Sequence, residues 1–328
     1  MRIFVTGGLG FTGAALTGRL LDEGYEVSVL DKRPGLVMDE LSARGADITL
    51  GSVTDREVVE RCTEGCEVVM HVAAAFRETG APDSLYDAVN VDGTRNTVEA
   101  ALAAGVRKYV YCSTQGVHGN IDDPPGDETS PVEPEDYYQA TKYRGEQVVR
   151  EYDDRGMEWT ILRPTAIYGP GDSERFAMIF RRVDRGKFPM FGTGSTFYHP
   201  VYIDNLVDAF LLTIPEGVGA REAYIIADDE YVSIRDLVRR VAKALDTDVK
   251  IPTYPIGPLI VAGHVCEKLC KPFGIKPPIF PRRVDWFRQV RAFRIDKARR
   301  ELGYEPRVPL DEGLRRTGQW YRENGYLS

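Results

Sequence analysis

Short apolar runs alternate with longer amphipathic segments over the first half of the chain. Strands are predicted at 3–5, 26–31, 47–50, 67–72, 108–113 and 158–162. Helices are predicted between them at 14–21, 83–104 and 136–152, and one more after Gly51, where Thr54 or Asp55 could cap it. Strands that alternate with helices are typical of a parallel sheet with crossover helices. The pattern therefore predicts a doubly wound α/β fold.

The regular alternation ends near Pro170. Beyond it the sequence predicts helices at 175–185, 204–213 and 233–245, a short strand within 188–200, and a strand at 223–227. Ser233 is the expected cap of the last helix. The stretch 252–281 is rich in proline and carries an apolar stripe of Leu259, Ala262, Cys266 and Leu269. We expect a first domain over 1–170 and a smaller substrate-binding lobe over 171–328, interleaved with it.

Gly7, Gly10 and Gly13 lie in the turn between the first strand and the first helix. Gly7 allows a tight turn, Gly10 lets the backbone approach a pyrophosphate, and Gly13 lets the helix pack close to the strand. The helix N-terminus offers free N–H groups and a positive dipole end to phosphates. This spacing, one residue longer in its first gap than the common fingerprint, predicts a Rossmann dinucleotide site. An ordinary glycine-rich turn is the alternative.

Asp31 ends the second predicted strand. An acid there can accept both hydroxyls of an adenosine ribose, and its charge repels a 2′-phosphate, which favours NAD over NADP. Lys32 and Arg33 follow it and could pair with a phosphate. A capping role for Asp31 is the alternative interpretation.

Composition excludes several classes of protein. The 328 residues carry a net charge of −8 without a basic block, which argues against a nucleic-acid surface. No apolar run approaches the roughly 18 residues that span a bilayer, and the first strand leaves no room for a signal peptide. The cysteines, four apart on predicted helices at 62/66 and 266/270 and single at 112, lack the spacing of a zinc site. We expect no metal, reduced thiols and a cytoplasmic location.

Polar residues gather where ligands bind in open parallel sheets. Ser113 and Thr114 end the fifth strand, and Tyr138 and Lys142 share one face of the following helix. The polar loop 119–134 could be an active-site flap or a plain surface loop. Residues 163–171 are expected to form a rigid loop at the same sheet edge. His71 is expected to be structural rather than a base.

The glycine-rich turn, the acid at the end of strand two, the hydroxyls at the end of strand five and the Tyr138/Lys142 pair follow one another along the chain. In this order they resemble the extended short-chain dehydrogenase/reductase family, which includes sugar-nucleotide epimerases and dehydratases and 3β-hydroxysteroid dehydrogenases. The resemblance covers nearly the whole chain. Its motifs are the Gly7/Gly10/Gly13 turn, His71–Ala74, Asn90–Thr94, Tyr111–Thr114 with Val117 and Gly119, Tyr138 with Lys142, Arg163–Pro164 with Tyr168–Pro170, and Lys297–Ala298 with Leu302–Tyr304.

The resemblance implies the roles of individual residues. Tyr138 would be the acid/base on a substrate hydroxyl or carbonyl, Lys142 would bind the nicotinamide ribose and lower the tyrosine pKa, and Thr114 would hydrogen-bond the reacting oxygen. The implied NAD contacts are Gly7, Gly10, Phe11, Thr12, Gly13, Asp31, Lys32, Ser52, Val53, Val72, Ala73, Ala74, Asn90, Cys112, Tyr138, Lys142, Pro164 and Thr165. The implied substrate contacts are Phe76, Thr114, Gln115, Tyr138, Ala166 and Tyr198.

Departures from the family pattern reduce the number of family reactions that this sequence fits. Gln115 and Gly116 stand where the 4,6-dehydratases carry an Asp-Glu pair. Tyr198 stands near an arginine that grips the nucleotide diphosphate in many epimerases, and Ala166 replaces an asparagine. Another arginine of the lobe could bind the diphosphate in place of the missing one. The candidates are Arg175, Arg181, Arg182, Arg282 and Arg283.

These departures favour an NAD-dependent oxidoreductase that acts on a secondary alcohol or ketone, similar to the 3β-hydroxysteroid dehydrogenases. The apolar segment 256–269 and the motif 277–283 resemble the C-terminal lobe of that branch. A sugar-nucleotide 4-epimerase is the alternative, and a non-catalytic cofactor-sensing protein is a third reading. We expect a small-molecule substrate and a homodimer that forms through the helices at 83–104 and 137–152.

Overall fold

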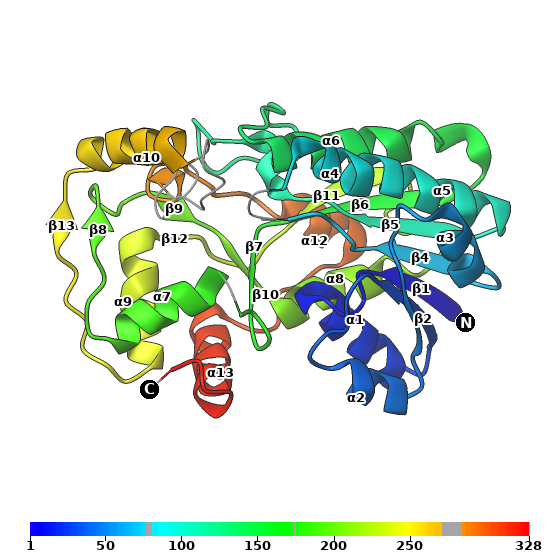
Figure 1. The fold of residues 1–328 in the computed structure, drawn as a ribbon, viewed down its shortest axis with the longest axis horizontal. Coiled ribbons are helices and arrows are strands. Elements are labelled where there is room, and N and C mark those ends of the chain that lie inside the picture. The colour runs from blue at the N-terminus through cyan, green and yellow to red at the C-terminus, as the bar shows by residue number, and fades with distance from the viewer. Residues whose placement is uncertain (77–80, 174, 271–283, 328) are drawn as a thin grey trace.

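A seven-stranded parallel sheet forms the centre of the molecule (Figure 1). The computed structural model describes residues 1–76, 81–173, 175–270 and 284–327. The strand order is β11-β6-β5-β4-β1-β2-β3, with β4 in the central position. This is the Rossmann strand order extended by one strand, and it confirms the predicted doubly wound fold. The strands are β1 (Arg2–Thr6), β2 (Glu26–Asp31), β3 (Asp47–Leu50), β4 (Val68–His71), β5 (Lys108–Cys112), β6 (Glu158–Pro164) and β11 (Glu222–Ile226).

Helices cover both faces of the sheet (Figure 1). Along β1 alternate side chains serve the two faces, because Ile3 and Val5 belong to one apolar cluster and Phe4 to another. One face carries α1 (Phe11–Asp22), α2 (Met38–Ala43) and α8 (Ile203–Leu212). The other carries α3 (Arg56–Thr63), α4 (Asp83–Asp87), α5 (Gly93–Ala103) and α6 (Tyr137–Arg150).

Local signals in the first half predict the elements closely. β2 and β3 have the predicted bounds, and the Asp55 carboxylate caps α3 by accepting the N–H of Val58 at 3.3 Å. The predicted helix 83–104 is interrupted by a π turn at Ala88–Asp92. The prediction that Cys66 lies on a helix is wrong, because α3 ends at Thr63.

Much of the second half forms a lobe beside the sheet (Figure 1). The helices of the lobe are α7 (Arg175–Asp184), α9 (Ile234–Ala244), α10 (Gly257–Cys270) and α13 (Leu310–Glu323), whereas α12 (Asp296–Leu302) packs against β11. The predicted cap of α9 is present, because the Ser233 hydroxyl accepts the N–H of Asp236 at 3.0 Å. Short paired strands connect them: β8 (Met190–Phe191) with β13 (Thr253–Tyr254), and β9 (Phe197–Tyr198) with β12 (Val232–Ser233).

Two predictions about short strands are wrong. The single strand expected within 188–200 is replaced by two, β8 and β9. The expected loop 163–171 contains the end of β6 and a further strand, β7 (Ala166–Tyr168), which pairs in parallel with β10 (Pro200–Tyr202). Its partner is remote in sequence, so no local signal marks it.

The two halves of the chain share one sheet and one core. β11 comes from the second half and pairs with β6 at the sheet edge. Phe180 of α7 and Tyr321 of α13 belong to the same apolar cluster as Val5 of β1. The exact division into 1–170 and 171–328 stays a prediction.

The predicted apolar stripe lies on α10. Leu259 and Cys266 are partly buried there, whereas Ala262 and Leu269 are exposed. Across the described ranges, the helices fall short of the length and apolar character that a bilayer crossing requires.

Candidate cofactor and active site

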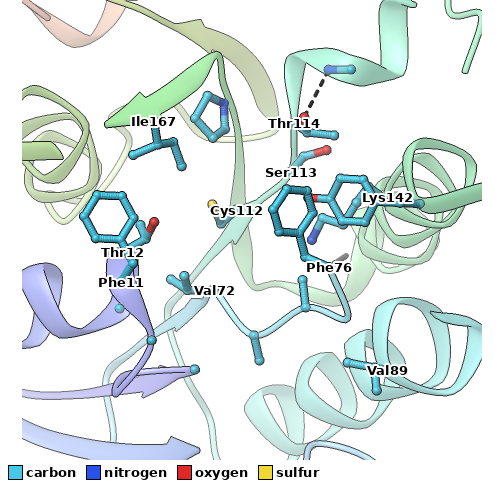
Figure 2. A pocket seen from close by; sticks show the side chains of 18 of the residues that line it. Phe11, Thr12, Val72, Phe76, Val89, Cys112, Ser113, Thr114, Lys142 and Ile167 are labelled. Atoms are coloured by element: carbon cyan, nitrogen blue, oxygen red, sulfur yellow. Dashed lines mark hydrogen bonds between the residues drawn. The ribbon is translucent and has the colours of Figure 1, made fainter. Parts of the chain in front are cut away.

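A cavity of about 550 Å³ opens at the carboxyl ends of the central strands. Figure 2 shows Phe11 and Thr12 of α1 on one side and Phe76, Thr114 and Lys142 on the other. This is the sheet edge at which doubly wound proteins bind ligands, and the volume suits a dinucleotide with a small substrate.

Most of the residues predicted from the sequence line this one cavity. The cofactor residues that do so are Gly7, Gly10, Phe11, Thr12, Gly13, Asp31, Lys32, Ser52, Val53, Val72, Ala73, Ala74, Cys112, Tyr138, Lys142, Pro164 and Thr165. The substrate residues that do so are Phe76, Thr114, Gln115 and Tyr138. Three predicted residues stand outside the lining: Asn90, Ala166 and Tyr198.

The glycine-rich turn is shaped as its sequence predicts. Gly7 has a φ of +69°, a conformation that strains residues with a Cβ, and a Cβ there would lie 2.8 Å from the backbone of Ala73. A Cβ on Gly13 would lie 2.0 Å from the Gly7 carbonyl oxygen. Gly7 therefore lets the turn lie against the backbone of Ala73, and Gly13 lets α1 pack against the turn. The first residues of the helix, Phe11–Gly13, line the cavity.

Asp31 lies beside this turn. One carboxylate oxygen accepts the N–H of Leu9 at 3.0 Å, and the other accepts the N–H of Arg33 at 3.3 Å. The carboxylate is thereby held at the cavity wall next to Lys32. A ribose whose hydroxyls donate to it would fit this arrangement.

Asn90 supports the cavity from behind. It is fully buried in the π turn, and its amide accepts the N–H of Ala75 at 2.8 Å and donates to the Ala75 carbonyl at 3.2 Å. It also donates to the Thr141 hydroxyl at 2.9 Å. These bonds consume its polar atoms, so Asn90 fixes the 73–75 segment relative to α6 and does not line the cavity.

Ala166 and Tyr198 also lie behind the wall. Ala166 is buried in β7, and Tyr198 is 3% exposed. The Tyr198 ring packs against Phe176 at 6.2 Å and against Trp286 at 5.8 Å, measured between ring centroids. Trp286 itself lines the cavity, so Tyr198 can act on a ligand only through it.

His71 has the structural role expected of it. It is fully buried, with Nδ1 2.7 Å from the Thr6 hydroxyl and Nε2 3.1 Å from the Thr94 hydroxyl. Burial lowers the pKa of His71 well below its usual value, because the charged ring is poorly solvated there.

Lys142 carries a buried ammonium group. The side chain is 1% exposed, and Nζ lies 4.1 Å from the centroid of the Tyr111 ring. Nζ has no hydrogen-bond partner in the part of the chain that the structure describes. Burial lowers the pKa of Lys142 to about 8. A buried donor of this kind needs an acceptor, and the hydroxyls of a nicotinamide ribose would supply it.

Tyr138 and Thr114 line the same cavity. The Tyr138 ring packs edge-on against Phe76, with centroids 4.9 Å apart. The Thr114 hydroxyl oxygen accepts the N–H of Gly116 at 3.1 Å and so caps a short 3₁₀ turn at Gln115–His118 (Figure 2). The hydroxyl proton of Thr114 is then available for an oxygen atom of a substrate.

A buried polar network lies under these residues and was not predicted. Ser113 donates to Glu146 at 2.5 Å, and Arg163 donates to both oxygens of that carboxylate. Arg163 also approaches Nε2 of His118 at 3.0 Å. Glu146 follows Lys142 by one helical turn on α6, a spacing that could have suggested that the two share a face.

Sequence reasoning missed several lining residues, among them Gln139, Ile167, Asp172, Trp286 and Arg291. Trp286 and Arg291 come from a segment of irregular structure late in the chain, which has no periodic signal. Of the five arginines proposed as substitute cations, Arg181 and Arg182 do not line the cavity. The side chain of Arg175 lies outside the described residues, and so do Arg282, Arg283 and the rest of the 277–283 motif.

The loop 119–134 is tied to this late segment. The N–H of Ile121 donates to Val290 at 3.0 Å, and the N–H of Gly126 donates to Ala292 at 2.9 Å. No residue of the loop, all of which is described, lines the cavity. The active-site flap remains a hypothesis, and the contacts favour a packed surface loop.

Comparison with known proteins decides the family. Residues 3–227 match the NAD dependent epimerase/dehydratase family. The chain belongs to this family. It is 32% identical to the 3beta-hydroxysteroid-dehydrogenase/decarboxylase isoform 1 of Arabidopsis thaliana, over 95% of this chain and 78% of the relative.

Solved structures of this family superpose over the whole chain. A UDP-glucose 4-epimerase of Thermotoga maritima, solved with UDP-glucose, has a TM-score of 0.80 at 26% identity and covers 99% of each chain. DesIV, a dTDP-glucose 4,6-dehydratase of Streptomyces venezuelae solved with NAD and TYD bound, has a TM-score of 0.79 at 28% identity, over 100% of this chain and 99% of its own. The predicted extended short-chain dehydrogenase/reductase family, an enzyme and NAD as its cofactor are confirmed.

Proposed function

We propose that this NAD-dependent enzyme interconverts a secondary alcohol and a ketone with net release or consumption of NADH, as a 3β-hydroxysteroid dehydrogenase does. The observation that carries the proposal is the lining of one cavity by Tyr138, Thr114 and Lys142, next to the apolar surfaces of Phe76 and Trp286. The similarity to the Arabidopsis dehydrogenase/decarboxylase over nearly the whole chain supports it.

In this proposal each residue has a distinct task. Thr114 and Tyr138 hold the reacting oxygen of the substrate, and the Tyr138 phenolate removes the hydroxyl proton. The buried charge of Lys142 favours that phenolate, because an opposite charge nearby lowers the pKa of an acid. The Gly7–Gly13 turn and Asp31 hold the dinucleotide. NAD, when bound, accepts the hydride from the substrate carbon.

The cavity offers little support for a dehydratase. Gln115 and Gly116 line it where that chemistry would need two carboxyl groups. Among the described lining residues, the carboxylates are Asp31 and Asp172. Asp31 lies at the glycine turn, and Asp172 accepts the N–H of Phe176 at 2.8 Å at the start of α7. Neither sits at the Thr114 turn.

A sugar-nucleotide 4-epimerase remains the alternative. It would use the same Thr114, Tyr138 and Lys142 and return the hydride to the opposite face of the ketone. Such an enzyme must retain its substrate during turnover, and a diphosphate is held well by arginine forks. Tyr198, at the position predicted for such an arginine, lies behind Trp286, but Arg291 lines the cavity and could provide a cation.

The deciding experiment follows absorbance at the NADH band with NAD and a panel of hydroxysteroids, small secondary alcohols and UDP-sugars. We expect NADH to accumulate in proportion to the alcohol consumed, with weak binding of UDP-sugars. Interconversion of two UDP-sugars without NADH release would establish the epimerase instead. Any turnover excludes the third reading, a cofactor-sensing protein without activity.

We also propose that the enzyme is a cytoplasmic homodimer that associates through the helices at 83–104 and 137–152. These segments pack side by side in one chain: Arg144 pairs with Asp87 at 2.5 Å, and Tyr137 donates to Asp87 at 2.7 Å. Tyr137 remains 38% exposed, so apolar surface is available to a second copy. Sedimentation equilibrium of the wild type should give the mass of a dimer, and a monomer would refute this.

A further inference from the structure

The wall of the cofactor cavity contains a buried amide oxygen that has no partner in the described chain. Gln115 lines the cavity directly after Thr114, the residue assigned to the reacting oxygen of the substrate. Gln115 is 7% exposed, and its Oε1 atom is buried without a hydrogen bond to any described residue. Because an unpaired buried acceptor is costly, its place in a cavity wall indicates a hydrogen-bond donor on a ligand.

The 3₁₀ turn that begins with Gln115 is held at both ends. At its start the N–H of Gly116 donates to the Thr114 hydroxyl oxygen at 3.1 Å (Figure 2). At its end His118 is 1% exposed, and its Nε2 atom lies 3.0 Å from the Arg163 guanidinium. The backbone of Gln115 is therefore fixed, and rotation of the side chain is the remaining freedom that can bring the amide to a partner.

The polar neighbours of Gln115 in the wall have partners of their own. Ser113 donates to Glu146 at 2.5 Å. The Oε1 atom of Gln139 accepts the N–H of Glu135 at 2.7 Å. Within the described residues neither Ser113 nor Gln139 donates to Oε1 of Gln115. A ligand in the cavity is then the source of the missing donor.

This ligand is the substrate rather than the cofactor. Two other buried polar atoms of the cavity lining, Nζ of Lys142 and Oγ1 of Thr165, also have no partner among the described residues. Both belong to predicted NAD contacts. Gln115 belongs to the predicted substrate contacts and adjoins Thr114, so its partner is expected on the molecule whose oxygen Thr114 binds.

A hydroxyl group is the partner that suits this amide. It can donate to Oε1 and accept from Nε2, so it satisfies Gln115 in either orientation of the amide. Thr114 and Gln115 are successive residues, whose Cα atoms are about 3.8 Å apart. Two groups bound by such close side chains lie on neighbouring parts of one small molecule.

We propose that the substrate is a vicinal diol and that Gln115 binds its second hydroxyl group, on the carbon next to the reacting carbon. The inference rests on the proposed oxidation of a secondary alcohol. The reacting carbon gives its hydride to NAD, its hydroxyl proton goes to Tyr138, and a C=O bond forms. The second hydroxyl is unchanged, so the product is a hydroxyketone.

The test compares NADH production from alcohols that differ only in a hydroxyl on the adjacent carbon. The pairs are cyclohexanol and trans-1,2-cyclohexanediol, butan-2-ol and butane-2,3-diol, and a 3β-hydroxysteroid without and with a 2-hydroxyl group. We expect kcat/KM to be about tenfold or more higher for the diol, because only the diol satisfies the buried amide. Equal or lower values for the diols would overturn this inference and leave the proposed function intact. Absence of NADH with all three pairs would overturn the proposed function, and this inference with it.

A variant assigns the preference to Gln115. Gln115→Met keeps the length of the side chain and removes its hydrogen-bonding atoms, so the ratio of kcat/KM between diol and alcohol should fall about tenfold. Gln147→Met changes an exposed glutamine of α6 outside the cavity and should keep the wild-type ratio. Gln115→Leu replaces the methionine variant if that variant fails to fold. A wild-type ratio in the Gln115 variant would overturn the assignment.

Discussion

Arg163 donates two hydrogen bonds to the Glu146 carboxylate, from Nε at 2.9 Å and from Nη2 at 2.6 Å. The two side chains are 5% and 0% exposed. Glu146 lies on α6, which also carries Tyr138 and Lys142, and Arg163 lies at the end of β6. Because Glu146 also accepts the Ser113 hydroxyl, the pair fixes the ends of β5 and β6 against the helix that carries the proposed acid/base.

Glu146→Gln should lower the free energy of unfolding by about 3 kcal/mol or more, because it leaves the Arg163 charge buried without a counter-charge. Urea denaturation measures this. Glu60→Gln is the matched control, since it removes a carboxylate from the exposed Arg56–Glu60 pair (58% and 46% exposed) and should cost at most about 1 kcal/mol. Equal losses in the two variants would mean that burial adds nothing to the Glu146 pair.

Asp31→Asn should weaken NAD binding about tenfold and reduce the preference over NADP. The amide oxygen can still accept the N–H of Leu9, so the turn is retained while the charge that repels a 2′-phosphate is lost. Calorimetry with both cofactors, on wild type and variant, measures the change. If the wild type already bound NADP more tightly, Lys32 and Arg33 would be the phosphate ligands instead.

Tyr138→Phe should reduce turnover by about 10²- to 10⁴-fold and leave NAD affinity nearly unchanged, because only the proton-transfer group is removed. Tyr137→Phe, on the adjacent residue, removes a hydroxyl that donates to Asp87 outside the cavity and should retain activity. Steady-state kinetics, with the substrate that the absorbance panel identifies, and calorimetry with NAD separate the two effects. Near-normal turnover of Tyr138→Phe would refute the assignment.

The parts of the site that the sequence predicts are those set by local chemistry. A glycine with positive φ, an acid at a strand end and two side chains on one helix face leave signatures within a few residues. Gly7, Asp31 and Lys142, which were identified from such signatures, line one cavity. Their contacts with a cofactor stay predictions.

The parts that escape prediction depend on long-range packing. Trp286 reaches the cavity because the late segment is held by the 119–134 loop and by Tyr198, which lies far away in sequence. Asn90 has the polar side chain of a ligand-binding residue, but the π turn directs it to the backbone of Ala75. Such outcomes follow from contacts that no local pattern specifies.

The buried ammonium of Lys142 should make the stability of the cofactor-free enzyme depend on pH. Burial lowers its pKa in the folded state to about 8, against about 10.5 in an unfolded chain. Between these values the unfolded chain binds a proton that the folded chain does not, so the contribution of Lys142 to the free energy of unfolding rises with pH.

Lys142→Met lacks this contribution. Relative to the variant, the wild type should therefore gain stability by up to about 3 kcal/mol as the pH rises from about 8 to about 10.5. The difference between the two proteins is the readout, because other titrating groups contribute equally to both. Lys187→Met, which removes an exposed lysine, controls for the loss of one charge. Urea denaturation across this pH range measures the difference. If the free energy of unfolding changed with pH equally in the wild type and in Lys142→Met, burial would not lower the pKa of Lys142 in the folded state.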